Sequence, residues 1–367
     1  MLGKSMVKGI LIISNLIVAI LMAITLIGSV ISPEKFILPA YTSLFFPLTI
    51  LVNAAFVVFW IVARKWYFII SLAILFTGSK EISDVFAFNF GEVESEYTSK
   101  PVHILTYNTH LLAGMVKHTK KQPNGVIQYI LDSNADIVCL QEFAVSPKKE
   151  YITDDDIDKI FRKDYPYRFV YYHNDKKWAN VGIAIMSKFP ILKKKIIDIG
   201  SNYNISVFAD IVIEKDTVRL INNHLESNKL TETDREMPIQ LKDSFNTERF
   251  SGTTMHLSRK LESAYKIRAR QADKIAGIIK DSPYKVIVCG DFNDVPASYT
   301  YTKVRGELKD AFTEQGFGFG WTLNIPAYKF RIDYIMYDRS FMAADYRVGK
   351  CKSSDHYPVE CNLYLEK

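Results

Sequence analysis

The chain has 367 residues and a formal net charge of +6, from 46 Lys and Arg against 40 Asp and Glu. This length suits two unequal parts better than one average domain. The charge is uneven, because residues 1–78 carry five basic groups against one acidic group, whereas the remaining residues carry 41 against 39. The larger part is therefore nearly neutral, and its totals do not support tight, sequence-independent binding to nucleic acid, which relies on many Lys and Arg at phosphates.

Uncharged runs open the chain. Residues 9–33 and 36–63 contain no charged side chain, and each run exceeds the roughly 20 apolar residues with which a helix crosses a bilayer. A third run, residues 66–79, has only 14 residues, and a buried or re-entrant piece is the rival interpretation. Residues 1–79 are therefore predicted to be a membrane anchor with two or three transmembrane helices, at about 9–31, 38–63 and 66–79.

Basic residues around these runs predict their orientation. Lys4 and Lys8 precede the first run, and Arg64 and Lys65 follow the second, so both ends are drawn to the cytoplasmic side. If the third run crosses, everything after about residue 80 lies outside the cytoplasm, which is the expectation we adopt; otherwise the larger part is cytosolic. A cleaved signal peptide is disfavoured, because the first run is too long and lacks a small-residue cleavage site near its end. An integral membrane protein with the lipid bilayer as a partner is expected.

The remainder is predicted to be a linker, residues 80–100, followed by a folded domain, residues 101–367. Helical spacing is found at 124–133 and 258–279, and residues 227–257 form a long polar segment typical of a functional or mobile loop. Apolar runs predict strands at 102–107, 136–142, 168–173, 181–187, 207–213, 218–223, 286–290, 332–337 and 359–365. Many strands with few helices favour an α+β fold, a sandwich of two sheets with helices packed outside.

The most informative stretch is residues 286–294, Val-Ile-Val-Cys-Gly-Asp-Phe-Asn-Asp. Four apolar residues run into a glycine and then into Asp291 and Asn293, the pattern of a buried strand that ends in a loop. Side chains two apart on an extended chain point the same way, so Asp291 and Asn293 are expected to face one small space. An ordinary polar turn after a core strand is the alternative, because Gly-Asp-x-Asn is also good turn chemistry.

The same arrangement recurs, because a chemically able residue follows each of several predicted strands. These residues are Asn108, Glu142, His224, Asp291 with Asn293, Arg331 with Asp333, and the segment Ser354-Asp355-His356. Gathered at one edge of a sandwich, they would form a pocket of carboxylate, imidazole and amide groups. Hard oxygen ligands of this kind suit Mg²⁺ or Mn²⁺. Cysteine is absent from the set, which disfavours a thiolate zinc site.

At these positions the chain resembles the endonuclease/exonuclease/phosphatase superfamily, whose fold is shared by exonuclease III, DNase I, neutral sphingomyelinases and inositol-polyphosphate 5-phosphatases. The matching pieces follow the family's order from about residue 101 to 365. They are Leu105-Thr-Tyr-Asn108, Val138-Cys-Leu-Gln-Glu142, Gly182-Ile-Ala-Ile-Met-Ser187, Asn223-His-Leu225, Gly290-Asp-Phe-Asn293, Arg331-Ile-Asp-Tyr334 and Ser354-Asp-His356. The resemblance implies a four-layer α/β/β/α sandwich and divalent-metal-dependent hydrolysis of phosphate esters.

The resemblance also implies metal-site roles. Glu142 matches the family's metal-binding acid, Asn108 a residue that steadies the metal site, and Asp355 a metal-binding or outer carboxylate. His110 stands where several members have an acid, which leaves a second metal ligand there open. Arg268, on the predicted helix, is a candidate phosphate contact, although a solvated helix face is the more common setting for such a residue.

The remaining matches concern catalysis. Asp291 matches the residue that orients or deprotonates the attacking water, and Asn293 a contact to the phosphate and leaving group. Asp333 and His356 match an Asp–His pair, in which the carboxylate fixes the tautomer and raises the basicity of the ring. His224 matches a phosphate contact, although a lone His after a strand is more often a satisfied core or surface residue.

The sequence leaves the substrate open. A membrane-tethered phosphoesterase of unspecified substrate comes first, then an endo- or exonuclease, then a lipid phosphodiesterase resembling the sphingomyelinases, which closeness to a bilayer favours. The non-enzyme alternative is a tethered binding module on an inactive version of the fold, and the retained acids and histidine disfavour it. A monomer is expected. Cys351 and Cys361 flank the Ser-Asp-His segment and could form a disulfide outside the cytoplasm, although such cysteines are more often small core residues.

Overall fold

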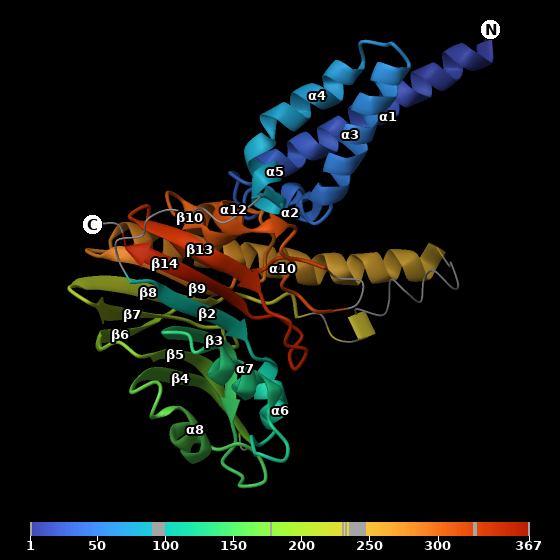
Figure 1. Ribbon diagram of the computed structural model, residues 1–367. Coiled ribbons are helices and arrows are strands. Elements are labelled where there is room, and N and C mark those ends of the chain that lie inside the picture. The colour runs from blue at the N-terminus through green and yellow to red at the C-terminus, as the bar shows by residue number, and fades with distance from the viewer. Residues whose placement is uncertain are drawn as a thin grey trace. The chain divides into compact units, whose positions relative to one another are not determined.

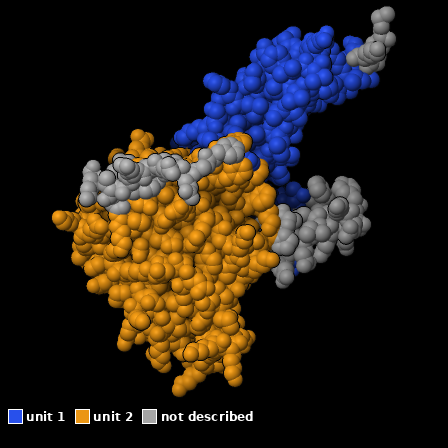
Figure 2. Space-filling view, in the orientation of Figure 1, with its two compact units in different colours: residues 1–86, 228–269, 295–304 blue, residues 87–227, 270–294, 305–367 orange. Residues whose placement is uncertain are grey.

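A computed structural model describes residues 2–89, 100–176, 178–229, 231, 233–234, 247–325 and 329–365 of the chain (Figure 1). The chain divides into two compact units (Figure 2). Unit 1 comprises residues 1–86, 228–269 and 295–304, and unit 2 comprises residues 87–227, 270–294 and 305–367.

Unit 1 is helical. Its elements are α1 (Leu2–Gly28), α2 (Leu38–Ser43), α3 (Phe46–Val62), α4 (Phe68–Thr77) and α5 (Ser79–Val85), together with the first part of α10 (Thr247–Lys280) and most of α11 (Tyr299–Arg305). One helix of the described chain, over Ser5–Gly28, is long and apolar enough to cross a membrane, and a signal sequence near the N-terminus passes the same test. Helices α3 and α4 are apolar but shorter.

The single span predicted at residues 38–63 is wrong, because the segment forms two helices with a turn at Leu44 and Phe45. Pro47 explains the break. In a continuous helix it would lie in the interior, where its ring clashes with the carbonyl of Ser43 and its nitrogen cannot donate. In the first turn of α3 neither problem arises, because those amides have no partner within the helix.

The linker predicted at residues 80–100 contains regular structure at its start. Helix α5 continues to Val85, which is buried, and strand β1 (Ala87–Phe88) pairs with β11 (Phe317–Gly318). The segment is polar in composition, but a buried apolar residue and a pairing partner 230 residues away order it. Residues 90–99 lie outside the described part of the chain.

Unit 2 contains two mixed sheets of six strands each. One has the order β10-β12-β9-β8-β7-β6 and the other the order β13-β14-β2-β3-β5-β4. The first consists of β6 (Ile191–Ile197), β7 (Ser206–Ile213), β8 (Asp216–His224), β9 (Lys285–Asp291), β10 (Lys309–Asp310) and β12 (Asp333–Tyr337). The second consists of β2 (Val102–Asn108), β3 (Ile137–Val145), β4 (Tyr167–Lys176), β5 (Ala179–Ser187), β13 (Phe341–Val348) and β14 (Val359–Leu365). The pairs β2–β3 and β8–β9 are parallel, and the other pairs are antiparallel.

Two apolar cores hold these layers together. The first lies between the sheets, where residues such as Ile104 and Ile185 meet Leu220 and Ile287. The second lies on the outer face of the second sheet, beneath α6 (His110–Met115), α7 (Gly125–Ser133) and α8 (Asp154–Phe161) (Figure 1). Helix α12 (Ala311–Gln315) and residues 270–280 of α10 complete the unit. Two mixed sheets with helices fit a DNase I-like α/β sandwich, so the predicted fold class is confirmed at this level.

Most predicted elements are present, and the exceptions have physical reasons. Strand β6 was not predicted, because Ile-Leu-Lys-Lys-Lys-Ile-Ile does not alternate; it is an edge strand whose lysines are exposed, which protects an edge from further pairing. Helix α10 begins at Thr247, inside the loop predicted at residues 227–257. Of that loop, residues 230, 232 and 235–246 lie outside the described part of the chain.

Candidate active site

At one edge of the first sheet, β8 and β9 end and the antiparallel strand β12 begins. In the β8–β9 register His224 faces Asp291, and in the β9–β12 register Asp291 faces Asp333. Gly290 permits this approach: its φ is 126°, and a Cβ there would lie 2.0 Å from the carbonyl oxygen of Asn223. The strand ends therefore bring a histidine and two aspartates together.

The second sheet contributes Asn108 and Glu142. Asn108 is the last residue of β2 and pairs with Gln141 of β3. The register of β3 shifts between Leu140 and Phe143, and Glu142 within this bulge has φ 47°. A bulge re-aims a side chain away from the regular alternation, and a left-handed non-glycine residue is a strained conformation that clusters at functional sites.

Asp291 is the centre of the arrangement. Its Oδ2 accepts a hydrogen bond of 2.9 Å from Nδ2 of Asn108, which lies 3.4 Å from Oε1 of Glu142. Nε2 of His224 lies 3.8 Å from the same Asp291 oxygen and 3.7 Å from Oε1 of Glu142. Glu142 and Asp291, which are far apart in the sequence, therefore share an amide and an imidazole as neighbours.

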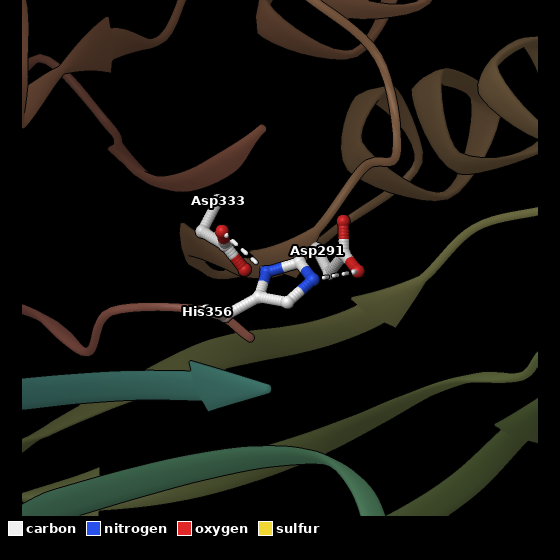
Figure 3. A group of neighbouring side chains, drawn as sticks. All are labelled: Asp291, Asp333 and His356. Atoms are coloured by element: carbon white, nitrogen blue, oxygen red, sulfur yellow. Dashed lines mark hydrogen bonds and ion pairs between the residues drawn. The ribbon is translucent and has the colours of Figure 1, made fainter. Parts of the chain in front are cut away.

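His356 lies between two aspartates (Figure 3). Its Nδ1 is 2.9 Å from Oδ2 of Asp333, and its Nε2 is 3.8 Å from Oδ2 of Asp291. Ser354 fixes the backbone here, because its hydroxyl donates to the Asn108 carbonyl at 2.8 Å and accepts from the His356 amide at 3.1 Å. The ring is thus oriented by Asp333 and directed at Asp291.

Asn293 lies beside Asp291, but its backbone conformation differs from the extended one predicted. Strand β9 ends at Asp291, so the alternation argument does not apply to a residue two positions later. Asn293 has φ 53°, its backbone N–H donates to Oδ1 of Asp291 at 2.7 Å, and its side-chain amide donates to the Leu225 carbonyl at 2.9 Å. A turn, and not an extended strand, joins Asp291 to Asn293.

Asp355 lies at the rim of the site. Its Oδ1 is 3.2 Å from Nδ1 of His110, and both side chains are partly exposed. His110 begins a turn in which it and the next five residues, up to Met115, have positive φ. Left-handed helical turns are costly for residues with a Cβ, and this one begins two residues after Asn108.

Arg268 belongs to unit 1 and is fully buried on α10. Its Nη1 donates to Oδ1 of Asn228 at 2.8 Å, and its guanidinium lies 4.8 Å from the ring centre of Tyr265. It is therefore not on a solvated helix face, and its contact with a phosphate stays a prediction.

Burial and charge shift the pKa values of the site. Burial raises the pKa of Asp291 to about 6 and raises that of Glu142, whereas burial lowers the pKa of His224. Burial alone would also lower the pKa of His356, but the charges of Asp333 and Asp291 outweigh it and raise the pKa to about 10. The two carboxylates beside His356 therefore favour its protonated form.

The comparisons with known proteins identify the family. Residues 105–356 match the model of the Endonuclease/Exonuclease/phosphatase family. The chain belongs to this family. Its members hydrolyse phosphoester bonds, and the site residues described above, Arg268 included, lie within the matched range. Residues 8–85 match a separate family described as a domain of unknown function (DUF8431). No curated protein matches the chain significantly.

Several solved structures are similar to the chain at low identity. An endonuclease/exonuclease/phosphatase from Beutenbergia cavernae is 13% identical, with a TM-score of 0.50 over 73% of this chain and 72% of that one. A humanized TDP2 from D. rerio is 16% identical, with a TM-score of 0.47 over 72% of this chain and 98% of that one. The human Nocturnin catalytic domain with bound sulfate is 15% identical, with a TM-score of 0.49 over 74% and 97%. At 13% identity, the similarity to the B. cavernae structure supports the fold and not a function.

The family's usual divalent cation fits the residues present. Glu142 offers a partly exposed carboxylate beside the buried carboxylate of Asp291, and a cation would relieve their repulsion. Nε2 of His224 is buried without a hydrogen bond, which leaves it for a group that enters the site. Ligand atoms of Asp291, Asp333 and His356 also lie within 4.8 Å of one another. We favour Glu142, because Nδ1 of His356 is already bonded to Asp333, and the flanking carboxylates favour a protonated ring, which does not ligate a metal.

Other members of the site were not recognised in the sequence. The Thr322 hydroxyl accepts from the backbone amides of Ile332 and Asp333, at 3.0 and 3.2 Å, and so fixes the start of β12. Behind the site, Nε2 of Gln141 donates to Oδ1 of Asn222 at 2.7 Å, which joins the two sheets. A threonine in a loop carries no sequence signal, whereas two buried amides within apolar strands could have been noticed.

Proposed function

We propose that this chain is a divalent-metal-dependent phosphoesterase that attacks phosphorus with an activated water and is tethered to a membrane by its N-terminal helices. The observation that supports it is the convergence of Asn108, His224 and His356 on one oxygen of Asp291, with Glu142 beside them. Family membership supports phosphoester hydrolysis, and the apolar helix over Ser5–Gly28 supports the tether.

Asp291 acts as the general base. It accepts a proton from a water whose oxygen then bonds to phosphorus, while the ester P–O bond on the opposite side breaks. Its pKa of about 6 keeps it ionised at neutral pH yet close enough to that pH to take a proton. The Asp333–His356 pair is assigned a different role, because the carboxylates on both sides of His356 raise its pKa and favour a ring that donates hydrogen bonds.

The surrounding side chains orient the phosphoryl group. His224 and His356 present Nε2 to the same region and donate hydrogen bonds that strengthen as charge grows on the phosphoryl oxygens. Glu142 would hold the divalent cation, Mg²⁺ or Mn²⁺, with Asp355 nearby and Asn108 steadying the carboxylate. When bound, the cation would offset charge on the phosphoryl oxygens.

The test is hydrolysis of bis-p-nitrophenyl phosphate by the full-length protein in detergent, with Mg²⁺ or Mn²⁺. Asp291→Asn should lower the rate about 10²–10⁴-fold. Asp216→Asn, which removes a surface carboxylate at the other end of β8, should retain the wild-type rate. Wild-type rates for Asp291→Asn, or full activity in EDTA, would contradict the proposal. Calorimetric titration with Mn²⁺ should show weaker binding to Glu142→Gln than to Asp216→Asn.

A nuclease is the second candidate, and an exposed aromatic pair favours it. Phe319 and Trp321 stack with ring centres 5.3 Å apart and planes 12° apart, and Trp321 is largely exposed. The same segment lies beside the site, because Leu323 forms an isolated β-bridge with His356. Aromatic faces bind unpaired bases by stacking. Rates on single-stranded DNA, RNA and phospholipid vesicles should separate a nuclease from a lipid phosphodiesterase, and Trp321→Ala should impair only the former.

A further inference from the structure

Helices α1, α3 and α4 of unit 1 are apolar outside and enclose a cluster of polar side chains beside apolar ones such as Met22 and Trp60. Asn15, Asn53 and Ser71, one from each helix, are completely buried. The exposed side chains include large apolar ones on every helix: Ile13 and Ile20, Leu51 and Val58, and Leu72 and Phe76. A helix bundle in water has the opposite distribution, with an apolar interior and a polar surface. This surface fits hydrocarbon, where outward apolar residues cost nothing.

The buried polar residues form one connected network. The hydroxyl of Ser71 lies 2.6 Å from Oδ1 of Asn15 and 2.9 Å from Oδ1 of Asn53, so its single proton serves two acceptors on two other helices. Nδ2 of Asn15 donates to the Tyr67 carbonyl at 3.3 Å, and Nδ2 of Asn53 donates to the Thr49 carbonyl at 2.9 Å. In both asparagine side chains the amide oxygen and the amide nitrogen therefore each have a hydrogen-bond partner, as buried polar groups must have in lipid.

Helix α4 runs in the same direction as α1. Its start is beside the N-terminal half of α1, because Tyr67 accepts from Asn15 and its ring lies 5.2 Å from Nζ of Lys8. Its end is beside the C-terminal half, because a Cβ on Gly78 would lie 3.0–3.2 Å from the side chains of Met22 and Leu26. Helix α3 returns between them, so the chain passes back and forth along one axis (Figure 1).

One end of this bundle has the composition of a cytoplasmic membrane boundary. Arg64 and Lys65 follow α3 at the end where Lys8 lies over Tyr67. The rings of Trp60 and Tyr67 pack edge to face at 5.1 Å there. Basic residues mark cytoplasmic loops, and Trp and Tyr gather at the interface.

The lengths are compatible with three crossings. From Lys8 to Gly28, α1 rises about 30 Å at 1.5 Å per residue, which equals the hydrocarbon thickness. From Tyr67 to Gly78, α4 rises about 17 Å. Because Gly78 is level with Met22 and Leu26, α4 stops only about 6 Å short of the end of α1. Of the roughly 30 Å rise of α1, α4 therefore covers about 17 Å, beginning about 7 Å inside the boundary at Lys8 and ending about 6 Å short of the other boundary.

We propose that α1, α3 and α4 are embedded together in a phospholipid bilayer, that the Asn15–Ser71–Asn53 network joins them, and that α4 crosses, so that the chain after Phe86 lies opposite the N-terminus. This inference rests on the membrane tether proposed above and adds a third crossing to it. With the basic end in the cytoplasm, the phosphoesterase domain faces the extracytoplasmic side and meets substrates there.

The first test is protease accessibility of the full-length chain, tagged at both ends. The chain is expressed in bacteria, which are then converted to spheroplasts. Proteinase K should remove the C-terminal tag from intact spheroplasts and leave the N-terminal tag, while a cytoplasmic marker protein stays intact. Retention of both tags by a protein that resists carbonate extraction would overturn the crossing of α4 but leave the tether. Release by carbonate would overturn the tether and this inference together. Loss of the N-terminal tag alone would overturn the orientation.

The second test addresses the network. Ser71→Ala removes the hydroxyl that joins Asn15 to Asn53, whereas Thr77→Val removes an exposed hydroxyl that bonds only the Ala73 carbonyl of its own helix. In SDS titrations of the reconstituted full chain, followed by tryptophan fluorescence, Ser71→Ala should unfold the bundle at a lower SDS fraction than wild type. Thr77→Val should match wild type. Equal midpoints for the two variants would overturn the role of the network.

The fluorescence needs reporters from the bundle alone. Two of the four tryptophans, Trp60 and Trp66, lie in unit 1, so Trp178 and Trp321 are replaced by Phe in all samples. This measurement does not depend on hydrolysis. A failed network test with normal metal-dependent activity would therefore refute the role of the network and leave the proposed reaction standing.

Discussion

Replacing Glu360 by Gln should destabilise unit 2, because this carboxylate is a buried junction between strands. Glu360 lies on β14 and is only 1% exposed. It accepts from Nε2 of His103 on β2 at 2.9 Å, from Nη2 of Arg347 on β13 at 2.7 Å, and from the hydroxyl of Tyr129. Strand β2 ends at Asn108, and β14 follows His356, so the junction also supports two strands that position the site.

The magnitude follows from the pKa of Glu360. Burial opposes its charge, but the hydrogen bonds from His103, Arg347 and Tyr129 outweigh burial and lower the pKa from 4.5 to about 2. At about 1.4 kcal/mol per unit, the carboxylate contributes about 3 kcal/mol at neutral pH. Because the folded pKa lies below the unfolded value, this contribution is complete above about pH 5 and is lost as the pH falls through 2. At pH 3 about 1.4 kcal/mol remains.

Thermal unfolding of the full-length protein in detergent measures the effect. At pH 7 Glu360→Gln should lower the melting temperature of unit 2 by about 7–14 °C, and the deficit should shrink by more than half at pH 3. The control is Glu307→Gln, which breaks an ion pair to Arg339 in which the Glu307 side chain is 88% exposed; it should shift melting by less than about 2 °C. A Glu360→Gln protein that melts with wild type at pH 7, or whose deficit is unchanged at pH 3, would refute this reasoning.

Two further predictions concern the first sheet. Asp210→Asn breaks a buried bidentate pair with Arg219, at 2.8 and 3.0 Å, and should cost about 3–5 kcal/mol of unfolding free energy; an unchanged urea midpoint would contradict it. Gly290→Ala forces a Cβ against the carbonyl of Asn223 beside Asp291, so activity and melting temperature should both fall. Gly277→Ala, in open space on α10, should do neither and serves as the control; equal behaviour of the two alanine variants would show that the close approach does not matter.

The site residues could be found in the sequence because each follows an apolar run. Buried strands are readable from composition, and a carboxylate or imidazole at their ends is costly unless it has a purpose. This reasoning located Glu142, His224, Asp291 and Asp333 before any pairing was known. It was wrong about how Asn293 is placed, because it extended strand alternation past the last residue of β9. Thr322 was missed because its role depends on the loop position, which leaves no pattern in the sequence.

In the N-terminal segment, too, the sequence predicted some features and left others to the tertiary structure. Charge-free runs predicted apolar helices, yet length alone left the third crossing undecided. Only the contacts of Tyr67 and Gly78 with α1 place both ends of α4 along the bundle. The interior polarity of the bundle was also invisible, because Asn15 and Ser71 are 56 residues apart and look like isolated interruptions of apolar runs.

The sequence by itself determined which residue types were available: apolar strands that end in acids, amides and histidines, a nearly neutral domain, and an uncharged beginning. Tertiary structure alone decided which of these groups meet. The bulge that turns Glu142, the register that sets His224 and Asp333 beside Asp291, and the packing that brings His356 between two aspartates all depend on hydrogen bonding between strands remote in the chain. Local sequence sets the preference of each segment, whereas register is chosen by the whole core at once.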